Sequence, residues 1–572
     1  MKKRFIGLAL TLSAAVAFGQ TRDLSREYLD AWQRFYPSQA LEQGMHTAIF
    51  EYEDRSPERI GEWLAFNREI IKSLSDPAFA YTRENRIDAR LLLVQARSEA
   101  DRWEKIAPHL HSLQLYTSLI AGAATPVLEA RYLNTAEKAQ LLCKRLRSVQ
   151  NLCDAATQSL TAVDRNDLDQ SLRQLEKAAG YYETELPAAV ANPACDGFTG
   201  QCRAVAAQIR DLVHYAENRL APRAREASPI LGREEYARQL ALYTDSDLTP
   251  ETLADMALEE IRTTRELINR VSQEYLHRQY PDRPLPDDID ASVQLALADM
   301  EKDAPVSGED YRIFWQELAD AAVRFIEEHD IATLPEYQTL RIVPAPESAG
   351  PAARIGWVDS APPFAPNPVT TLYLPSIPDT FPEQDRRDFW SSFNKPFNRM
   401  IVIHELFPGH YMQIKTSRET PHPIRMLFPY GVYIEGWATF CERVLLDAGW
   451  ERDRPLTFLA HLRKRLENAN RAYTSVQVHC HGWDQDQLMD FSVNTSLLAP
   501  QFAKSLWGRV TGSPMQVTSY FLGGRQFTDL LATEKARLGD RFVLRDFMDA
   551  IMREGPVPID EFPAIFEAAT PK

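Results

Sequence analysis

The sequence contains no dense cluster of lysine and arginine that could form a basic face for nucleic-acid phosphates, and its formal net charge is −16. It also has no internal repeat and no low-complexity tract. After the first 19 residues, no apolar run approaches the about 20 residues that a membrane-spanning helix needs. We therefore expect no nucleic-acid partner, no solenoid architecture and no integral membrane segment in the mature chain.

Residues 1–19 have the pattern of a secretory signal peptide. Three basic residues precede an apolar run from Phe5 to Phe18, and small residues suit cleavage before Gln20. No cysteine follows this run, so nothing marks a lipid attachment site. Loss of the peptide would remove three positive charges and change the net charge from −16 to −19. We expect an exported protein, periplasmic or secreted; an uncleaved membrane anchor is the alternative.

Cysteine is scarce, with six residues in the chain. Cys195 and Cys202 flank the turn-rich stretch DGFTGQ, and an oxidising compartment could close this short loop with a disulfide. Cys143 and Cys153 lie within a helical pattern, where isolated cysteines are commonly small buried residues.

Most of the sequence has the periodicity of amphipathic helices. Residues 87–103 and 135–152 are examples, because apolar residues recur there at every third or fourth position. Prolines and a glycine interrupt this pattern at residues 221–236, which we interpret as a joint between two lobes. We expect a helical scaffold lobe over residues 20–235 and a second lobe over residues 236–572, which carries the residue patterns described below; the two together could form one unit.

The pattern changes between residues 338 and 378, where β-branched and aromatic residues occur with many prolines. Proline cannot donate to a sheet ladder, so such strands lie at edges, and a free edge can pair with an extended peptide. The fold class that we predict is mainly α: a large, two-lobed helical bundle that encloses a deep cleft, with a small edge β-sheet near the metal site described next.

The segment NKPFNRMIVIHELFPGHYMQ (394–413) carries two histidines and a glutamate in a pattern typical of zinc chemistry. In a zincin helix two histidine ligands lie four residues apart, and the glutamate after the first histidine activates the attacking water. Here His404 and His410 are six residues apart, about 240° around an ideal helix, with Glu405 after the first. The proline and glycine at 408–409 would break the helix, and we predict that this break brings both histidines to one metal.

A second segment, PYGVYIEGWATFCERVLLDAG (429–449), supplies carboxylates. Glu435 and Glu442 are seven residues apart and therefore share one face of a helix. A carboxylate from this helix would complete the His, His, Glu set of a catalytic zinc site and leave the fourth position open for water. We predict one Zn²⁺ per chain, with Glu435 as the third ligand, and we expect Glu442 to contact a ligand rather than the metal.

The motifs HELFPGH and EGWATFCE resemble the HE-x-x-PGH and EGWA-x-x-x-E motifs of the bacterial family called domain of unknown function 885 (DUF885). That family is grouped with the gluzincin metallopeptidases and is distantly similar to the thimet oligopeptidase and thermostable carboxypeptidase families. Further similarity spreads over nearly the whole mature chain, at residues 28–44, 244–262, 514–523 and 538–562. The resemblance implies zinc at His404, His410 and Glu435, with Glu405 as the general base.

Three more residues are candidates for roles in the reaction. Tyr520 lies in a P-x-Q-x-x-x-Y-x-x-G pattern similar to one in the family, at a late position where related peptidases contribute a tyrosine, and it could donate to the oxyanion; a core tyrosine is the alternative. His479, in an H-x-x-GW pattern that lacks the expected preceding Asp, could be a second donor. Arg525 could hold a substrate carboxylate by a bidentate contact, which would favour recognition of a carboxyl terminus.

These residues predict a zinc-dependent peptidase that hydrolyses short or unfolded peptides. Glu405 would take a proton from the attacking water and pass it to the leaving amine. Two other readings remain open: an inactive or non-enzymatic periplasmic protein that binds peptides or other ligands, and a scaffold protein. The scaffold reading requires His404 and His410 to lie too far apart to share an ion.

Overall fold

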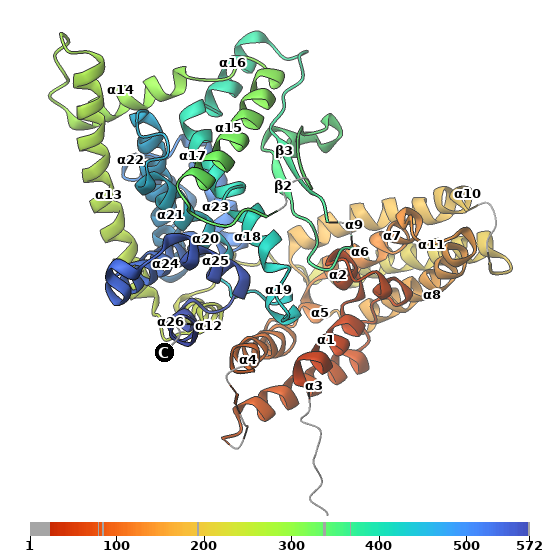
Figure 1. Cartoon of the computed structure of the whole chain (residues 1–572). Coiled ribbons are helices and arrows are strands. Elements are labelled where there is room, and N and C mark those ends of the chain that lie inside the picture. The colour runs from red at the N-terminus through yellow and green to blue at the C-terminus, as the bar shows by residue number, and fades with distance from the viewer. Residues whose placement is uncertain are drawn as a thin grey trace, which may run out of the picture.

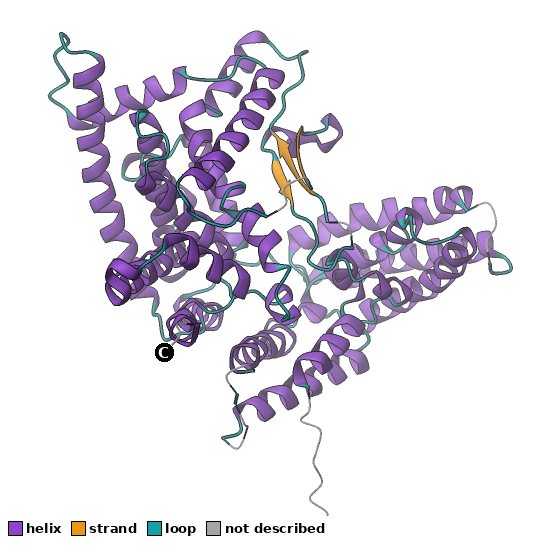
Figure 2. Cartoon of the chain, viewed as in Figure 1, coloured by secondary structure: helices purple, strands orange, loops and turns teal. Residues whose placement is uncertain are grey.

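A computed structural model of the chain describes residues 23–569, apart from residues 78, 80, 83–84, 191–193, 336–338 and 367. The signal peptide predicted over residues 1–19 lies outside the described residues. The predicted mainly α fold class, with a small sheet, is confirmed, because helices dominate and the strands form one small sheet (Figure 2). Within the described part, none of the helices combines the length and the apolar character needed to span a bilayer.

The first eleven helices run from red to yellow in Figure 1. They are α1 (Leu24–Phe35), α2 (Pro37–Glu42), α3 (Pro57–Ser75), α4 (Arg86–Asp101), α5 (Pro108–His111), α6 (Leu113–Gly122), α7 (Thr125–Glu129), α8 (Thr135–Ser159), α9 (Arg165–Gly180), α10 (Leu186–Ala189) and α11 (Phe198–Tyr215). Short 3₁₀ and π turns extend or link several of them.

The remaining helices, from yellow-green to blue, form the larger body in Figure 1. They are α12 (Arg233–Thr244), α13 (Pro250–Gln279), α14 (Ile289–Lys302), α15 (Gly308–Glu328), α16 (Glu383–Ser392), α17 (Lys395–Glu405), α18 (His410–Ser417), α19 (Pro423–Leu427), α20 (Tyr433–Ala448), α21 (Pro455–His481), α22 (Gln485–Asn494), α23 (Pro500–Gly512), α24 (Gln516–Leu538), α25 (Leu544–Glu554) and α26 (Phe562–Ala569). Local sequence explains several boundaries: Thr249 and Asn394 cap the N-termini of α13 and α17, and Gly449 ends α20 with a positive φ of 108°.

The hydrophobic core divides at a different place from the lobe boundary that we expected at residue 235. A large cluster joins α1, α3 and α4 to the helices that follow residue 235, whereas a smaller cluster is formed mainly by α6, α8, α9 and α11. A polar contact also joins α4 to the helices that follow residue 235. The Arg425 guanidinium of α19 donates to Asp88 of α4 at 2.7 Å, and both side chains are largely buried. The N-terminal helices α1, α3 and α4 therefore share one core with the region that holds the predicted site.

The sheet has three strands, β1 (Leu340–Pro344), β2 (Trp357–Asp359) and β3 (Thr370–Leu374), within the stretch where we predicted strands. Strand β3 is central, with β1 parallel to it on one side and β2 antiparallel on the other. Thr339, directly before β1, accepts a hydrogen bond at 3.1 Å from Lys415 of α18. The sheet thus lies beside the helix that begins at His410.

Cys195 forms a disulfide with Cys143, so the pairing of Cys195 with Cys202 that the sequence left possible does not form. The Cα atoms of Cys143 and Cys195 are 6.2 Å apart, within the usual range for a disulfide. Cys202 is instead fully buried on α11, in the smaller hydrophobic cluster. The sequence suggested the wrong partner because the packing of α8 against α11, rather than loop length, brings the two sulfurs together.

Candidate metal centre

The helix that carries His404 ends at Glu405, and a new helix begins at His410, so the predicted break is confirmed. The peptide bond before Pro408 is cis. Glycine is required at 409, because a Cβ there would lie 1.9 Å from the carbonyl oxygen of His404. The indole N–H of Trp437 on α20 donates to the carbonyl oxygen of Pro408 at 2.9 Å. The HELFPGH and EGWATFCE motifs therefore contact each other directly.

Glycines also bring α20 and α24 together. A Cβ on Gly436 would lie 2.4 Å from the Cα of Gly523, and a Cβ on Gly523 would lie 2.1 Å from the carbonyl oxygen of Val432. Only glycine allows the two backbones to approach this closely. The crossing places Glu435, next to Gly436, beside the first turn of α24.

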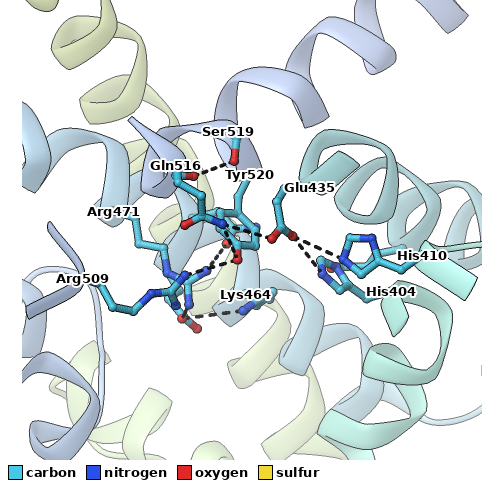
Figure 3. A network of polar contacts seen from close by, with 12 residues as sticks. His404, His410, Glu435, Lys464, Arg471, Arg509, Gln516, Ser519 and Tyr520 are labelled. Carbon is cyan, nitrogen blue, oxygen red and sulfur yellow. Dashed lines mark hydrogen bonds and ion pairs between the residues drawn. The ribbon is translucent and has the colours of Figure 1, made fainter. Parts of the chain in front are cut away.

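The three predicted ligands meet at one point (Figure 3). Candidate ligand atoms of His404, His410 and Glu435 all lie within 4.8 Å of one another. The Nε2 atoms of the two histidines are 3.6 and 3.4 Å from the same oxygen of Glu435. Ligand atoms about 2.0–2.1 Å from a tetrahedral zinc lie roughly 3.4 Å apart, so the observed donor set fits zinc. His404 and His410 are therefore close enough to share one ion, which contradicts the scaffold hypothesis.

The other nitrogen of His404 is held by a buried carboxylate. His404 Nδ1 lies 2.8 Å from Glu442, and the second oxygen of Glu442 lies 3.1 Å from His461 Nδ1. A hydrogen bond from Nδ1–H to Glu442 leaves the Nε2 lone pair of His404 free to face the metal position. Glu442 thus lies where we predicted it, whereas sequence spacing gave no signal for the part that His461 plays.

The electrostatics of the centre favour a positive charge. Burial would lower the pKa of His404, but Glu435 and Glu442 raise it to about 10. Burial would likewise raise the pKa of Glu435, but His404 and His410 hold it well below its usual range. A buried site of this kind stabilises a proton or a metal cation between its carboxylates. Glu405 ends α17 beside the centre and adds its negative charge to the field at His404.

Tyr520 lies next to the ligand set, as we predicted. Its ring is nearly parallel to that of His404, with centroids 6.4 Å apart. The amide nitrogen of Gln516, one helical turn earlier, lies 3.1 Å from Glu435 and 3.3 Å from the Tyr520 hydroxyl. Burial, together with the charge of Glu435, raises the pKa of Tyr520, so its hydroxyl stays protonated and can donate. We overlooked Gln516, although its spacing of four residues from Tyr520 indicates a shared helix face.

His479 lies away from this centre, so the donor role that we predicted for it is wrong. Its Nδ1 accepts a hydrogen bond from the backbone N–H of Leu231 at 3.1 Å, and its Nε2 donates to the carbonyl oxygen of Val510 at 3.0 Å. Its ring also stacks on Tyr236. Both ring nitrogens join backbone segments, which is a structural role that the H-x-x-GW pattern does not reveal.

Arg525 lies on the same helix as Tyr520 and lines a cavity of about 340 Å³ beside it. His461 and Asn468 of α21 line this cavity as well. The Arg525 side chain is about half exposed and lies 3.9 Å from Asp529. It therefore reaches the surroundings of Tyr520, and its contact with a substrate carboxylate stays a prediction.

The family described as "Bacterial protein of unknown function (DUF885)" matches residues 37–564. The chain belongs to this family. The solved structures that the DUF885 chain is similar to include a candidate lipoprotein of unknown function from Shewanella oneidensis, with 19% identity, a TM-score of 0.82, and coverage of 95% of this chain and 98% of that chain. A candidate lipoprotein from Colwellia psychrerythraea shows 18% identity, a TM-score of 0.67 and the same coverage. No curated protein matches.

Proposed function

We propose that this DUF885 protein is a zinc peptidase that hydrolyses short or unfolded peptides. The observation that carries the proposal is the convergence of His404, His410 and Glu435 across the broken helix, with Glu405 beside them. Zinc bound there would act as a Lewis acid toward the peptide carbonyl and acidify the attacking water.

The side chains around the ligands suit the remaining steps of hydrolysis. Glu405 would accept the proton of the attacking water and then transfer it to the leaving amine nitrogen. The protonated Tyr520 hydroxyl would donate to the oxygen on which negative charge develops. Gln516, which touches both Glu435 and Tyr520, would hold that hydroxyl in position. Glu442 would keep the His404 ring oriented with Nε2 toward the ligand position.

We also propose that the protein works outside the cytoplasm, in the periplasm or secreted. The predicted signal peptide and the Cys143–Cys195 disulfide support this location, because disulfides persist in oxidising compartments. The similar proteins from Shewanella and Colwellia are described as candidate lipoproteins, which agrees with a place in the cell envelope.

The test compares wild type with Glu405→Gln and His410→Ala. Metal content by mass spectrometry should give about one zinc per chain in wild type and in Glu405→Gln, and far less in His410→Ala. Hydrolysis of a mixed peptide library should fall by about 10²- to 10⁴-fold in Glu405→Gln, because that variant loses the general base.

Two results would redirect the proposal. Zinc binding without any hydrolysis by wild type favours the alternative, a peptide- or ligand-binding protein that keeps the metal. Absence of zinc from wild type, even after zinc is supplied, removes the basis for the peptidase assignment.

A further inference from the structure

Three basic side chains gather around Tyr520 (Figure 3). The guanidinium carbon of Arg471 lies 4.6 Å from the ring centroid of Tyr520, that of Arg509 lies 5.8 Å away, and Lys464 Nζ lies 5.9 Å away. A guanidinium nitrogen of Arg509 also donates to the Tyr520 hydroxyl at 3.2 Å. We call Lys464, Arg471 and Arg509 the cationic cluster.

The cationic cluster holds more positive charge than its surroundings neutralise. Glu467 pairs with Arg471 and lies 3.6 Å from Lys464. Burial would raise the pKa of Glu467, but the surrounding cations lower it to about 2. Among the residues that the structure describes, Arg509 pairs with no carboxylate. Lys464 and Arg471 are only 9% and 6% exposed and share Glu467, whereas Arg509 is exposed, so its charge is open to an anion of the substrate.

The cationic cluster lies close to the zinc ligands. Gln516 bridges Glu435 and the Tyr520 hydroxyl, and that hydroxyl contacts Arg509. Since one extended residue spans about 3.5 Å, these contacts place Arg509 within one to three residues of a peptide carbonyl at the metal position. The carboxylate at the end of a short peptide would be within reach of Arg509 at that distance.

We propose that the cationic cluster binds the C-terminal carboxylate of the substrate peptide, so that the protein removes residues from the carboxyl end. The inference rests on the proposed peptidase function and specifies its substrate class. Arginine suits this task because its planar fork matches both carboxylate oxygens. The side chain of an acidic residue offers the same chemistry, and the experiment below separates the two sources.

The experiment measures kcat/KM for three matched peptides that differ only at the last residue: a free acid, its amide, and the amide with glutamate in the last position. The zinc-loaded proteins are wild type, Arg509→Gln, Arg525→Gln and Arg262→Gln. Arg509 is exposed, so its replacement should not prevent folding. Arg262, an exposed arginine paired with Glu259 on α13, provides the matched control.

Wild type should prefer the free acid over the amide by about 10- to 100-fold, the ratio expected for hydrogen bonds to a charged group. Arg509→Gln should lose most of this preference, because cleavage of the free acid should fall much further than cleavage of the amide. Arg262→Gln should behave as wild type. Equal cleavage of free acid and amide by wild type overturns the inference, as does a loss of preference in Arg525→Gln instead of Arg509→Gln. Cleavage of the glutamate-ended amide as fast as that of the free acid would overturn the C-terminal assignment and would assign the cluster to an acidic side chain.

Binding to the inactive Glu405→Gln protein separates failure of this inference from failure of the proposed function. Calorimetry with the free-acid peptide and its amide should show at least about 10-fold tighter binding of the free acid, lost when Arg509→Gln is added. This result supports the carboxylate site even if wild type hydrolyses nothing. Equal affinity for the two peptides overturns the inference even if wild type is an active peptidase.

Discussion

Gly409→Ala tests whether the broken helix builds the metal centre. The added Cβ would lie 1.9 Å from the carbonyl oxygen of His404 and 2.3 Å from that of Ile403. Both contacts are with backbone atoms, which cannot rotate out of the way as a flexible side chain can. Alanine at 409 therefore forces the end of α17 and the start of α18 apart.

The size of the effect follows from these distances. Side-chain carbon atoms rarely approach other heavy atoms within 3.0 Å, so the backbone must open by about 1 Å. A zinc site tolerates ligand displacements of only about 0.2 Å, which means that His404 and His410 could no longer bind one ion together. Since changes outside the ligand set already cost about 10- to 100-fold in metal affinity, we expect at least a 100-fold loss. The free energy of unfolding should fall by about 1–3 kcal/mol.

Zinc affinity is measured by competition with a chromophoric chelator, and folding is checked by circular dichroism and thermal unfolding. Gly61→Ala is the matched control, because Gly61 lies inside α3 and a Cβ there meets open space. That control should keep wild-type zinc affinity and gain up to about 1 kcal/mol of stability, since alanine favours a helix. Wild-type zinc affinity in a folded Gly409→Ala protein would refute the proposed role of the helix break.

Further expected outcomes concern the buried partners of the centre and the disulfide. Glu442→Gln should lower zinc affinity by about 10- to 100-fold in the same competition assay, because it weakens the acceptor that orients His404; an unchanged affinity would contradict this role. Cys143→Ser should lower the free energy of urea unfolding by about 4 kcal/mol, because the disulfide to Cys195 spans 52 residues; reduced wild type should match the variant, and equal stability of the variant and oxidised wild type would count against the pairing. Glu467→Gln should lower the free energy of unfolding by roughly 2–3 kcal/mol at pH 7. Because the pKa of Glu467 is depressed to about 2, this difference should persist above about pH 4.5 and shrink as the pH falls toward 2; urea unfolding across this range tests it, and a constant difference would argue against a charge effect.

The sequence by itself determined the proposed ligand set and the helices that carry it. Proline and glycine at 408–409 specify a break through their own backbone limits, and the spacing of Glu435 and Glu442 places both carboxylates on one helix face. Caps such as Thr249 and prolines near helix starts likewise act within a few residues. Interactions of this range can be recognised without knowing how the chain folds back on itself.

Only the tertiary structure decided which distant surfaces meet. The pairing of Cys195 with Cys143 follows from the contact of two helices, and His479 is occupied by backbone segments that lie far from it in the sequence. His461 reaches Glu442, and Arg509 reaches Tyr520, because α21 and α23 pack beside the centre. No residue spacing signals these contacts, since they depend on how the apolar faces of many helices are buried together in one core.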